Sequence, residues 1–237
     1  AYLDDYSNLW FDTDPGFGGS GELEHQMIIW GEACQKKRTS LTGEQAVLDS
    51  TCRTEDIHRI QLLETHGFQR QQVRTLHYSR LLSDPIVRWQ LPEGFAIRAS
   101  RGLDEIAALV ELHRAAFETE NMTVEIRQAM MKSPLYVPEL DLVAVAPDGT
   151  LAAFCVCGFE DAEKRIGFTD PIGTHRGYRR HGLGQALVST GLVLLKGAGA
   201  EAVTLGTSSD NTAMQQLAEK SGFRVAREQL WFSKDLA

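Results

Sequence analysis

The sequence predicts a mixed α/β protein, and three observations carry that prediction. The hydrophobic pattern switches repeatedly between the period of two that is typical of strands and the period of about 3.6 that is typical of helices. Apolar residues make up 43% of the 237 residues, which is enough for packed cores. A glycine-containing loop separates a strand pattern from a helix pattern at residues 173–188, so a strand–helix–strand crossover is expected in the middle of the second half.

The second half gives the clearest order of elements. Residues 94–100 predict a strand, residues 102–117 a helix, and residues 123–133 a second helix with Thr123 as its N-cap. Residues 140–160 predict two strands around Asp148-Gly149, a pair that is typical of tight hairpin turns.

The elements continue with a strand at residues 164–175 that Pro171 interrupts. A loop and a helix follow to about residue 195, and residues 197–208 predict a glycine break and a strand. Residues 211–223 predict a helix that ends at Gly222, where a glycine can take the left-handed cap. Residues 223–236 close the half as a strand or a strand pair.

The first half repeats the end of this pattern. Residues 62–82 parallel residues 217–236 around a shared Gly-Phe, and residues 8–37 parallel residues 166–196. Nothing in the first half matches the elements of residues 95–160. We therefore expect a partial domain at residues 1–83, a linker with two prolines at residues 84–93, and a complete domain at residues 94–237.

Net charge, the lack of a long apolar window and the cysteine spacing disfavour several classes of protein. The formal net charge of −8 disfavours a general nucleic-acid binder, which needs a basic face. The N-terminus is acidic and no apolar window reaches about 18 residues, so we expect a cytoplasmic protein without a membrane span. The four cysteines lack metal-site spacing, so neither a metal site nor a disulfide is expected. Cys155 and Cys157 are expected as buried small apolar groups on one strand face.

The stretch RRHGLGQALV, residues 179–188, places cations and glycines at the start of a helix. Free N–H groups of a first helical turn, the helix dipole and nearby arginines together favour a small anion such as a phosphate. The alternative is an ordinary helix that starts after a polar loop. The stretch lacks the Lys-Ser/Thr of nucleotide-hydrolase loops and the GxGxxG of dinucleotide folds, which disfavours nucleotide hydrolysis and hydride transfer.

Residues 179–184 resemble the Arg/Gln-x-x-Gly-x-Gly/Ala signature of the GCN5-related N-acetyltransferase (GNAT) superfamily. The sequence NTAMQQLAEKSGF, residues 211–223, resembles a later segment of that family, and the element order of residues 94–236 also fits. The resemblance therefore covers the whole second half. With the half-copy in front, the chain looks like a tandem member, with a partial N-terminal copy of the GNAT fold and a complete C-terminal copy.

The resemblance implies acetyl-coenzyme A as the acetyl donor. Its pyrophosphate would lie on the loop, and its pantetheine would lie beside the interrupted strand like an added strand. Asn211 would bond the pantetheine or cap its own helix, and both possibilities stay open. The cofactor-binding residues implied are Ile172, Gly173, Thr174, Arg179, Arg180, His181, Gly182, Leu183, Gly184, Gln185 and Asn211.

Catalysis is less clearly marked in the sequence. Many members of the family carry a tyrosine as general acid where this chain has Ala218. The candidates for a general base are Glu160, Asp161 and Asp170, each of which can also be an ordinary surface carboxylate, whereas His175 and Tyr178 are more typical of packing or solvent groups.

The resemblance implies transfer of an acetyl group to a primary amine. A small-molecule acceptor is favoured because an acidic protein attracts cations. A protein or peptide amine, and a non-catalytic acyl-coenzyme A binding module supported by Ala218, are the alternatives. The oligomeric state is left open.

The first-half copy of the loop departs from the family pattern. It has GGSGELE, residues 18–24, where the second half has RRHGLGQ, so Gly18 replaces the arginine and Leu23 the second glycine. A shifted alignment places Glu22 and Glu24 at the glycine positions, and a carboxylate there repels a phosphate. We expect this half to bind no cofactor in the usual way, but to pack on the second half and shape the acceptor pocket.

Overall fold

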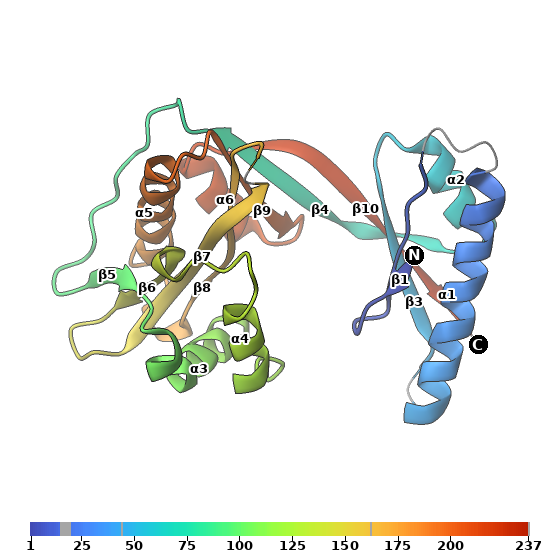
Figure 1. Cartoon of the computed structure of the whole chain (residues 1–237), viewed down its shortest axis with the longest axis horizontal. Helices are drawn as coiled ribbons and strands as arrows, with labels where there is room; N and C mark the ends of the chain where they lie inside the picture. The colour runs from blue at the N-terminus through green and yellow to red at the C-terminus, as the bar shows by residue number, and fades with distance from the viewer. Residues whose placement is uncertain (15–19, 44, 162, 237) are drawn as a thin grey trace. The chain divides into compact units, whose positions relative to one another are not determined.

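The computed structural model describes residues 1–14, 20–43, 45–161 and 163–236 (Figure 1). The chain forms two compact units. Unit 1 contains residues 1–76, 208–210 and 227–237, and unit 2 contains residues 77–207 and 211–226. Among the described residues, no helix is long and apolar enough to cross a membrane. No group of three or more His, Cys, Asp or Glu side chains within these ranges is arranged to hold a metal ion.

Unit 2 is a mixed sheet with helices on both faces, which confirms the mixed α/β class predicted from the sequence. The strands follow the order β4-β9-β8-β7-β6-β5, in which β8 and β9 are parallel and β5 to β8 pair antiparallel. Figure 1 shows α3 and α4 on one face and α5 on the other. The elements are β5 (Ala96–Ala99), η1 (Gly102–Glu105), α3 (Ile106–Phe117), α4 (Val124–Met131), η2 (Pro138–Leu140), β6 (Asp141–Val145), β7 (Leu151–Asp161), β8 (Ile166–Thr174), η3 (Arg176–Tyr178), α5 (Leu183–Gly197), β9 (Ala202–Ser208) and α6 (Thr212–Lys220).

Two apolar layers hold unit 2 together. On the α3 face, Leu109 and Leu112 pack against Phe154 and Val156 of β7. On the α5 face, a Cβ at Gly191 would lie only 2.6 Å from the Cys157 sulfur, so glycine lets α5 approach β7 closely. Cys155 and Cys157 are both buried, with their sulfurs 3.5 Å apart, which confirms the expected apolar role.

Unit 1 contains β1 (Tyr2–Leu3), β2 (Asn8–Trp10), α1 (Ser20–Thr42), β3 (Val47–Arg53) and α2 (Ile57–Thr65), together with parts of two long strands. Its strand order is β1-β2-β3-β10-β4, with β2 parallel to β3. Its core gathers apolar side chains from the sheet and both helices: Leu9, Ile28, Leu48, Cys52, Leu63, Phe68, Leu230, Phe232 and Leu236.

The strands β4 (Gln69–Leu81) and β10 (Arg224–Asp235) each contribute residues to both units. The sequence places residues 223–236 at the end of the second half, but residues 229–235 pair antiparallel with residues 47–53 in unit 1. The reason is burial, because Leu230 and Phe232 complete the unit 1 core. The domain boundaries drawn from the sequence stay a prediction.

The repeated Gly-Phe segments have the same local structure in both units. Asp56 caps α2 by accepting a hydrogen bond from the Arg59 N–H at 2.9 Å, and Asn211 caps α6 in the same way from Met214 at 3.1 Å. Both helices are followed by a glycine of positive φ, at positions 67 and 222. The buried phenylalanines at positions 68 and 223 come next.

Candidate functional site

The start of α5 carries N–H groups without partners inside the helix. Gly182 is its N-cap and supplies no side-chain hydrogen bond, and the first intrahelical bond runs from Ala186 N to Gly182 O at 3.1 Å. The N–H groups of Leu183, Gly184 and Gln185 therefore have no acceptor within the helix. Together with the positive end of the helix dipole, they form a site that suits an anion.

The two loop glycines serve different purposes. Gly182 has a φ of +75°, and a Cβ there would meet no atom within 4 Å, so the backbone is open on that side. At Gly184, a Cβ would lie 2.6 Å from Leu217 Cδ1. Gly184 therefore allows α5 to pack against α6. Of the two glycines, only Gly182 leaves its backbone open to a ligand on the side where a Cβ would lie.

The three basic side chains of residues 179–181 differ in the contacts that they make. Arg179 donates to Ala116 O at 2.9 Å and pairs with Glu118 at 3.1 Å, so its guanidinium contacts the C-terminal end of α3. Arg180 has a φ of +69° and no side-chain partner among the described residues. His181 Nδ1 lies 3.0 Å from Arg179 O, and its ring stacks on Phe95.

The parallel ladder between β8 and β9 ends early. It pairs only residues 166–168 with residues 202–204, whereas β8 continues to pair with β7 as far as Thr174. The β7–β8 register shifts between Cys155 and Cys157, beside the cis Asp170–Pro171 peptide. Ile172, Gly173 and Thr174 therefore face the β9 side without a strand ladder, and the register shift beside Pro171 is the kind of irregularity that a proline in a strand indicates.

Two of the candidate carboxylates reach β9 on the same face of the sheet. Glu160 Oε2 accepts a hydrogen bond from Thr204 Oγ1 at 2.9 Å. Asp170 Oδ2 lies 3.9 Å from the position that a Cβ would take at Gly206, two residues along β9. Solvent reaches the Asp170 side chain, but protein atoms crowd its carboxyl group, and this burial raises its pKa to about 6.

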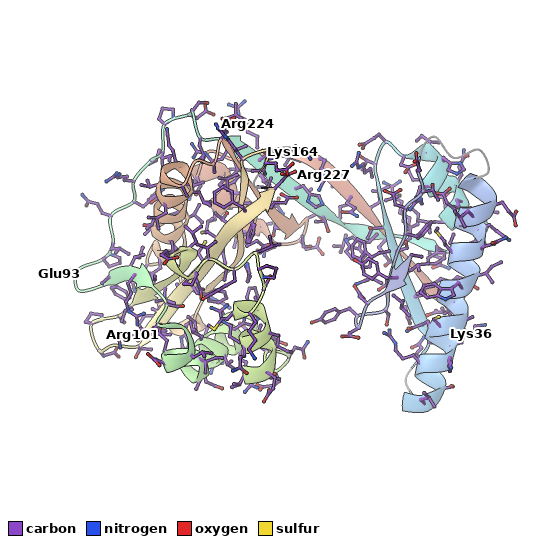
Figure 2. All side chains as sticks on the ribbon, viewed as in Figure 1. Lys36, Glu93, Arg101, Lys164, Arg224 and Arg227 are labelled. Atoms are coloured by element: carbon purple, nitrogen blue, oxygen red, sulfur yellow. The ribbon has the colours of Figure 1, made fainter. Side chains whose placement is uncertain are left out.

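The third candidate carboxylate has a partner of its own. Lys164, labelled in Figure 2 at the turn after β7, pairs with Asp161 at 2.8 Å. The hydrogen bond from this ammonium lowers the pKa of Asp161. Asp161 is therefore the weaker candidate for a base.

Asn211 and Ala218 belong to α6 and its cap, and His175 belongs to the cap of the η3 turn. Asn211 forms the helix cap, which satisfies one of the two possibilities left open for it. Ala218 is fully buried and has no proton to donate. The His175 side chain accepts from Gly177 N at 3.1 Å and caps the short η3 turn.

Sequence reasoning missed the β9 residues that face the carboxylates. Thr204 and Gly206 alternate with the buried residues Val203 and Leu205, and this period of two is visible in AVTLGTS. The sequence could not show that Thr204 and Gly206 lie near Glu160 and Asp170, because neighbouring strands of a sheet can be far apart in sequence.

Comparison with known proteins gives consistent results. The acetyltransferase (GNAT) family model matches residues 103–223. The chain is 34% identical over 161 residues to the mycothiol acetyltransferase of Kineococcus radiotolerans, covering 66% of this chain and 51% of that protein. It is 29% identical over 172 residues to that of Geodermatophilus obscurus, covering 69% and 56%. The chain spans about half the length of these curated relatives.

Solved structures are similar over most of the chain. A GCN5-related N-acetyltransferase from Sphaerobacter thermophilus matches with a TM-score of 0.79 and 26% identity, covering 94% of this chain and 70% of that one. A tandem GNAT protein from the clavulanic acid biosynthesis pathway matches with a TM-score of 0.73, covering 94% and 72%. Its 17% identity supports the fold alone.

Proposed function

Because the chain belongs to the acetyltransferase (GNAT) family, we propose that it transfers an acetyl group from acetyl-coenzyme A directly to a primary amine of a small molecule. The observation that carries this proposal is the end of the β8–β9 ladder, which lies in the same unit as the uncapped N-terminus of α5. Relatives named mycothiol acetyltransferase support a small-molecule acceptor.

Acetyl-coenzyme A fits the residues present. The free N–H groups at the start of α5 suit its pyrophosphate, and the open side of Gly182 leaves room for it. The β8 backbone beyond Phe168 has no β9 partner, so it can bond an extended pantetheine. We assign cofactor binding to Ile172, Gly173, Thr174, Arg179, Arg180, His181, Gly182, Leu183, Gly184, Gln185 and Asn211. When bound, the cofactor supplies an acetyl group activated as a thioester.

Asp170 is the proposed general base, and Glu160 the second candidate. A primary ammonium group must lose a proton before its nitrogen can form the new C–N bond. With a pKa of about 6, Asp170 is ionised at neutral pH and can accept that proton. A backbone N–H at Gly173 or Thr174 polarises the carbonyl, and the C–S bond breaks. Once the C–N bond has formed, the nitrogen must lose a second proton, and since Ala218 cannot donate one, water would carry that proton to the departing thiolate, giving the amide and the free thiol.

A buried carboxylate in α1 disfavours a cofactor site in the first half of the chain, so we assign the chemistry to the second half. In the first-half loop, residues 18 and 19 lie outside the described residues, but Glu24 is buried and pairs with Arg59 at 2.7 Å. This carboxylate belongs to an ion pair between α1 and α2. A pyrophosphate site there would place negative charge beside it.

Thioester consumption with a panel of small amines tests the proposal. Turnover on a small amine supports it, and cofactor binding without turnover on any amine contradicts it. Gly182→Glu is expected to weaken coenzyme A binding by tenfold or more, since a carboxylate there repels the pyrophosphate. Gly182→Ala controls for the strain of the positive φ, and Gly21→Glu in α1 is the matched first-half control. Equal losses in both halves would contradict the assignment.

A non-catalytic acyl-coenzyme A binding module is the second candidate. The buried Ala218 favours it, because no side chain there can protonate a leaving thiolate. Tight coenzyme A binding combined with unchanged thioester levels would support this candidate over the enzyme.

A further inference from the structure

Asp141, the first residue of β6, is a buried carboxylate with hydrogen-bond donors from separate segments. It is fully buried, and its Oδ2 accepts hydrogen bonds from Arg127 Nη2, from Tyr136 OH at 2.7 Å and from Ser100 Oγ at 2.8 Å. Arg127 is itself buried, so the pair is a charge-paired anchor within the unit 2 core.

The donors come from the segments around α4. Arg127 lies on α4, Tyr136 lies in the connection from α4 to β6, and Ser100 follows β5, next to the exposed Arg101 labelled in Figure 2. Burial, together with the hydrogen bond to Asp141, raises the pKa of Tyr136 to about 12, so its hydroxyl keeps its proton and stays a donor. One carboxylate therefore fixes the helix and the connection that follows it.

This connection lies on the sheet face that carries the candidate base residues. Leu135 O lies 3.5 Å from the position a Cβ would take at Gly158, and the same position meets the Phe168 ring at 2.7 Å. Phe168 pairs in register with Thr204, whose hydroxyl bonds Glu160. The connection from α4 to β6 therefore lies beside Gly158 and Phe168, next to the strand position whose Thr204 bonds Glu160.

We infer that Asp141, through Tyr136 and Arg127, positions α4 and residues 133–137 as a wall of the acceptor site. None of the anchored segments includes residues of the loop before α5, so we expect the anion site to keep its coenzyme A affinity when the wall is loosened. This inference rests on the proposed acetyltransferase function. Asp141, Arg127 and Tyr136 act in this inference as positioning residues, because their polar groups bond one another in the interior of unit 2.

Tyr136→Phe is the main test, because it removes one hydrogen bond and keeps the ring. A loosened wall contacts acceptor and transition state equally, so KM for the amine is expected to rise about tenfold while kcat and coenzyme A affinity change less than about twofold. Hydrogen exchange of residues 133–140 is expected to accelerate, while α5 and β8 keep their protection. Asp141→Asn is the stronger variant, but it leaves Arg127 without its buried charge partner and can prevent folding.

Tyr6→Phe, at an exposed tyrosine of unit 1, is the matched control and should change none of these values. An unchanged amine KM, or equal loss of coenzyme A affinity, overturns the inference. Unchanged exchange of residues 133–140 in Tyr136→Phe overturns it without any activity measurement. A wild-type chain that binds no coenzyme A and acetylates no amine contradicts the proposed function instead, and the exchange result still decides whether Tyr136 anchors the wall.

Discussion

Gly173 is confined by the packing of α3 onto β8. A Cβ at this position would lie 2.5 Å from the Phe154 ring and 2.9 Å from Ala116 Cβ. Real Cβ atoms do not approach this closely, so a larger residue must displace the ring or the helix. The family resemblance implies that the Gly173 backbone binds the cofactor. The structure adds a second reason for glycine, which is that a Cβ does not fit at this position.

Gly173→Ala is expected to destabilise unit 2 by about 1–3 kcal/mol through overpacking. Thermal or urea unfolding measures the change. Gly173→Ala combined with Phe154→Leu should lose less stability than the sum of the single variants, since the shorter side chain vacates the space. Additive losses would mean that the Phe154 contact is not the cause.

Asp170 gives the reaction a predicted pH dependence. Its pKa of about 6 in the folded chain lies above its ordinary value of 3.8. As base, Asp170 must be ionised, so kcat/KM is expected to rise as pH increases through about 6. Asp170→Asn should remove this limb and most of the activity, and Glu160→Gln is the comparison at the other carboxylate. A limb that persists in Asp170→Asn would exclude Asp170 as its source.

The raised pKa of Asp170 also makes the free energy of unfolding depend on pH. This stability is expected to fall as pH rises, whereas the activity is expected to rise. Because the folded chain binds the Asp170 proton more tightly than the unfolded chain, this group favours folding at low pH, and that contribution is lost as pH rises from about 4 to about 6. Asp170→Asn should remove this part of the pH dependence, as urea unfolding at several pH values would measure. Carboxyl groups whose pKa is raised because the fold destabilises their ionised form are typical of functional sites.

At the scale of elements, α1 and α2 are joined by a buried ion pair. Glu24 accepts from Arg59 Nη2 at 2.7 Å and contacts His58 Nε2 at 2.9 Å, and Arg59 also donates to Phe11 O at 2.9 Å. In unit 2, the corresponding pair of helices is packed by Gly184 against Leu217. The same helix arrangement is therefore held by charge in one unit and by close apolar contact in the other.

Arg59→Met is expected to cost about 3 kcal/mol, because it leaves the buried Glu24 carboxylate without its cation. Arg59→Met with Glu24→Gln should recover part of the loss, since no buried charge remains. Arg74→Met breaks the exposed Arg74–Glu228 pair of the same unit and is expected to cost less than about 1 kcal/mol. Urea unfolding compares the variants, and equal losses for the two arginines would contradict the role of burial.

Elements defined by local signals could be predicted from the sequence. Asp148-Gly149 forms the predicted turn, with Gly149 at a φ of +87° and Thr150 N bonded to Asp148 Oδ1. Thr123 forms the predicted cap, and Asn211 forms the cap that was one of its two possible roles. These features depend on neighbours within four residues. The Asp141 anchor and the face shared by Glu160 and Asp170 could not be predicted, because they depend on segments that only the folded sheet brings together.

At the scale of the whole molecule, the assignment of the last strand was also beyond the sequence. The pattern of residues 223–236 predicts a strand equally well in either half, since strand propensity does not specify a partner. Pairing of residues 229–235 with residues 47–53 places the C-terminal part of β10 in unit 1. The cores of the two units therefore do not follow the two halves of the chain.

Phe232→Ala tests this division directly. Phe232 is fully buried in the unit 1 core, so the truncation is expected to cost about 3–5 kcal/mol. Hydrogen exchange should accelerate in α1, α2 and β3, while α3 and α5 stay protected. Leu187→Ala, at a fully buried residue of α5, is the matched control and should loosen unit 2. If Phe232→Ala exposed α3 and α5 before α1 and α2, the end of β10 would stabilise the second half, as the sequence alone suggests.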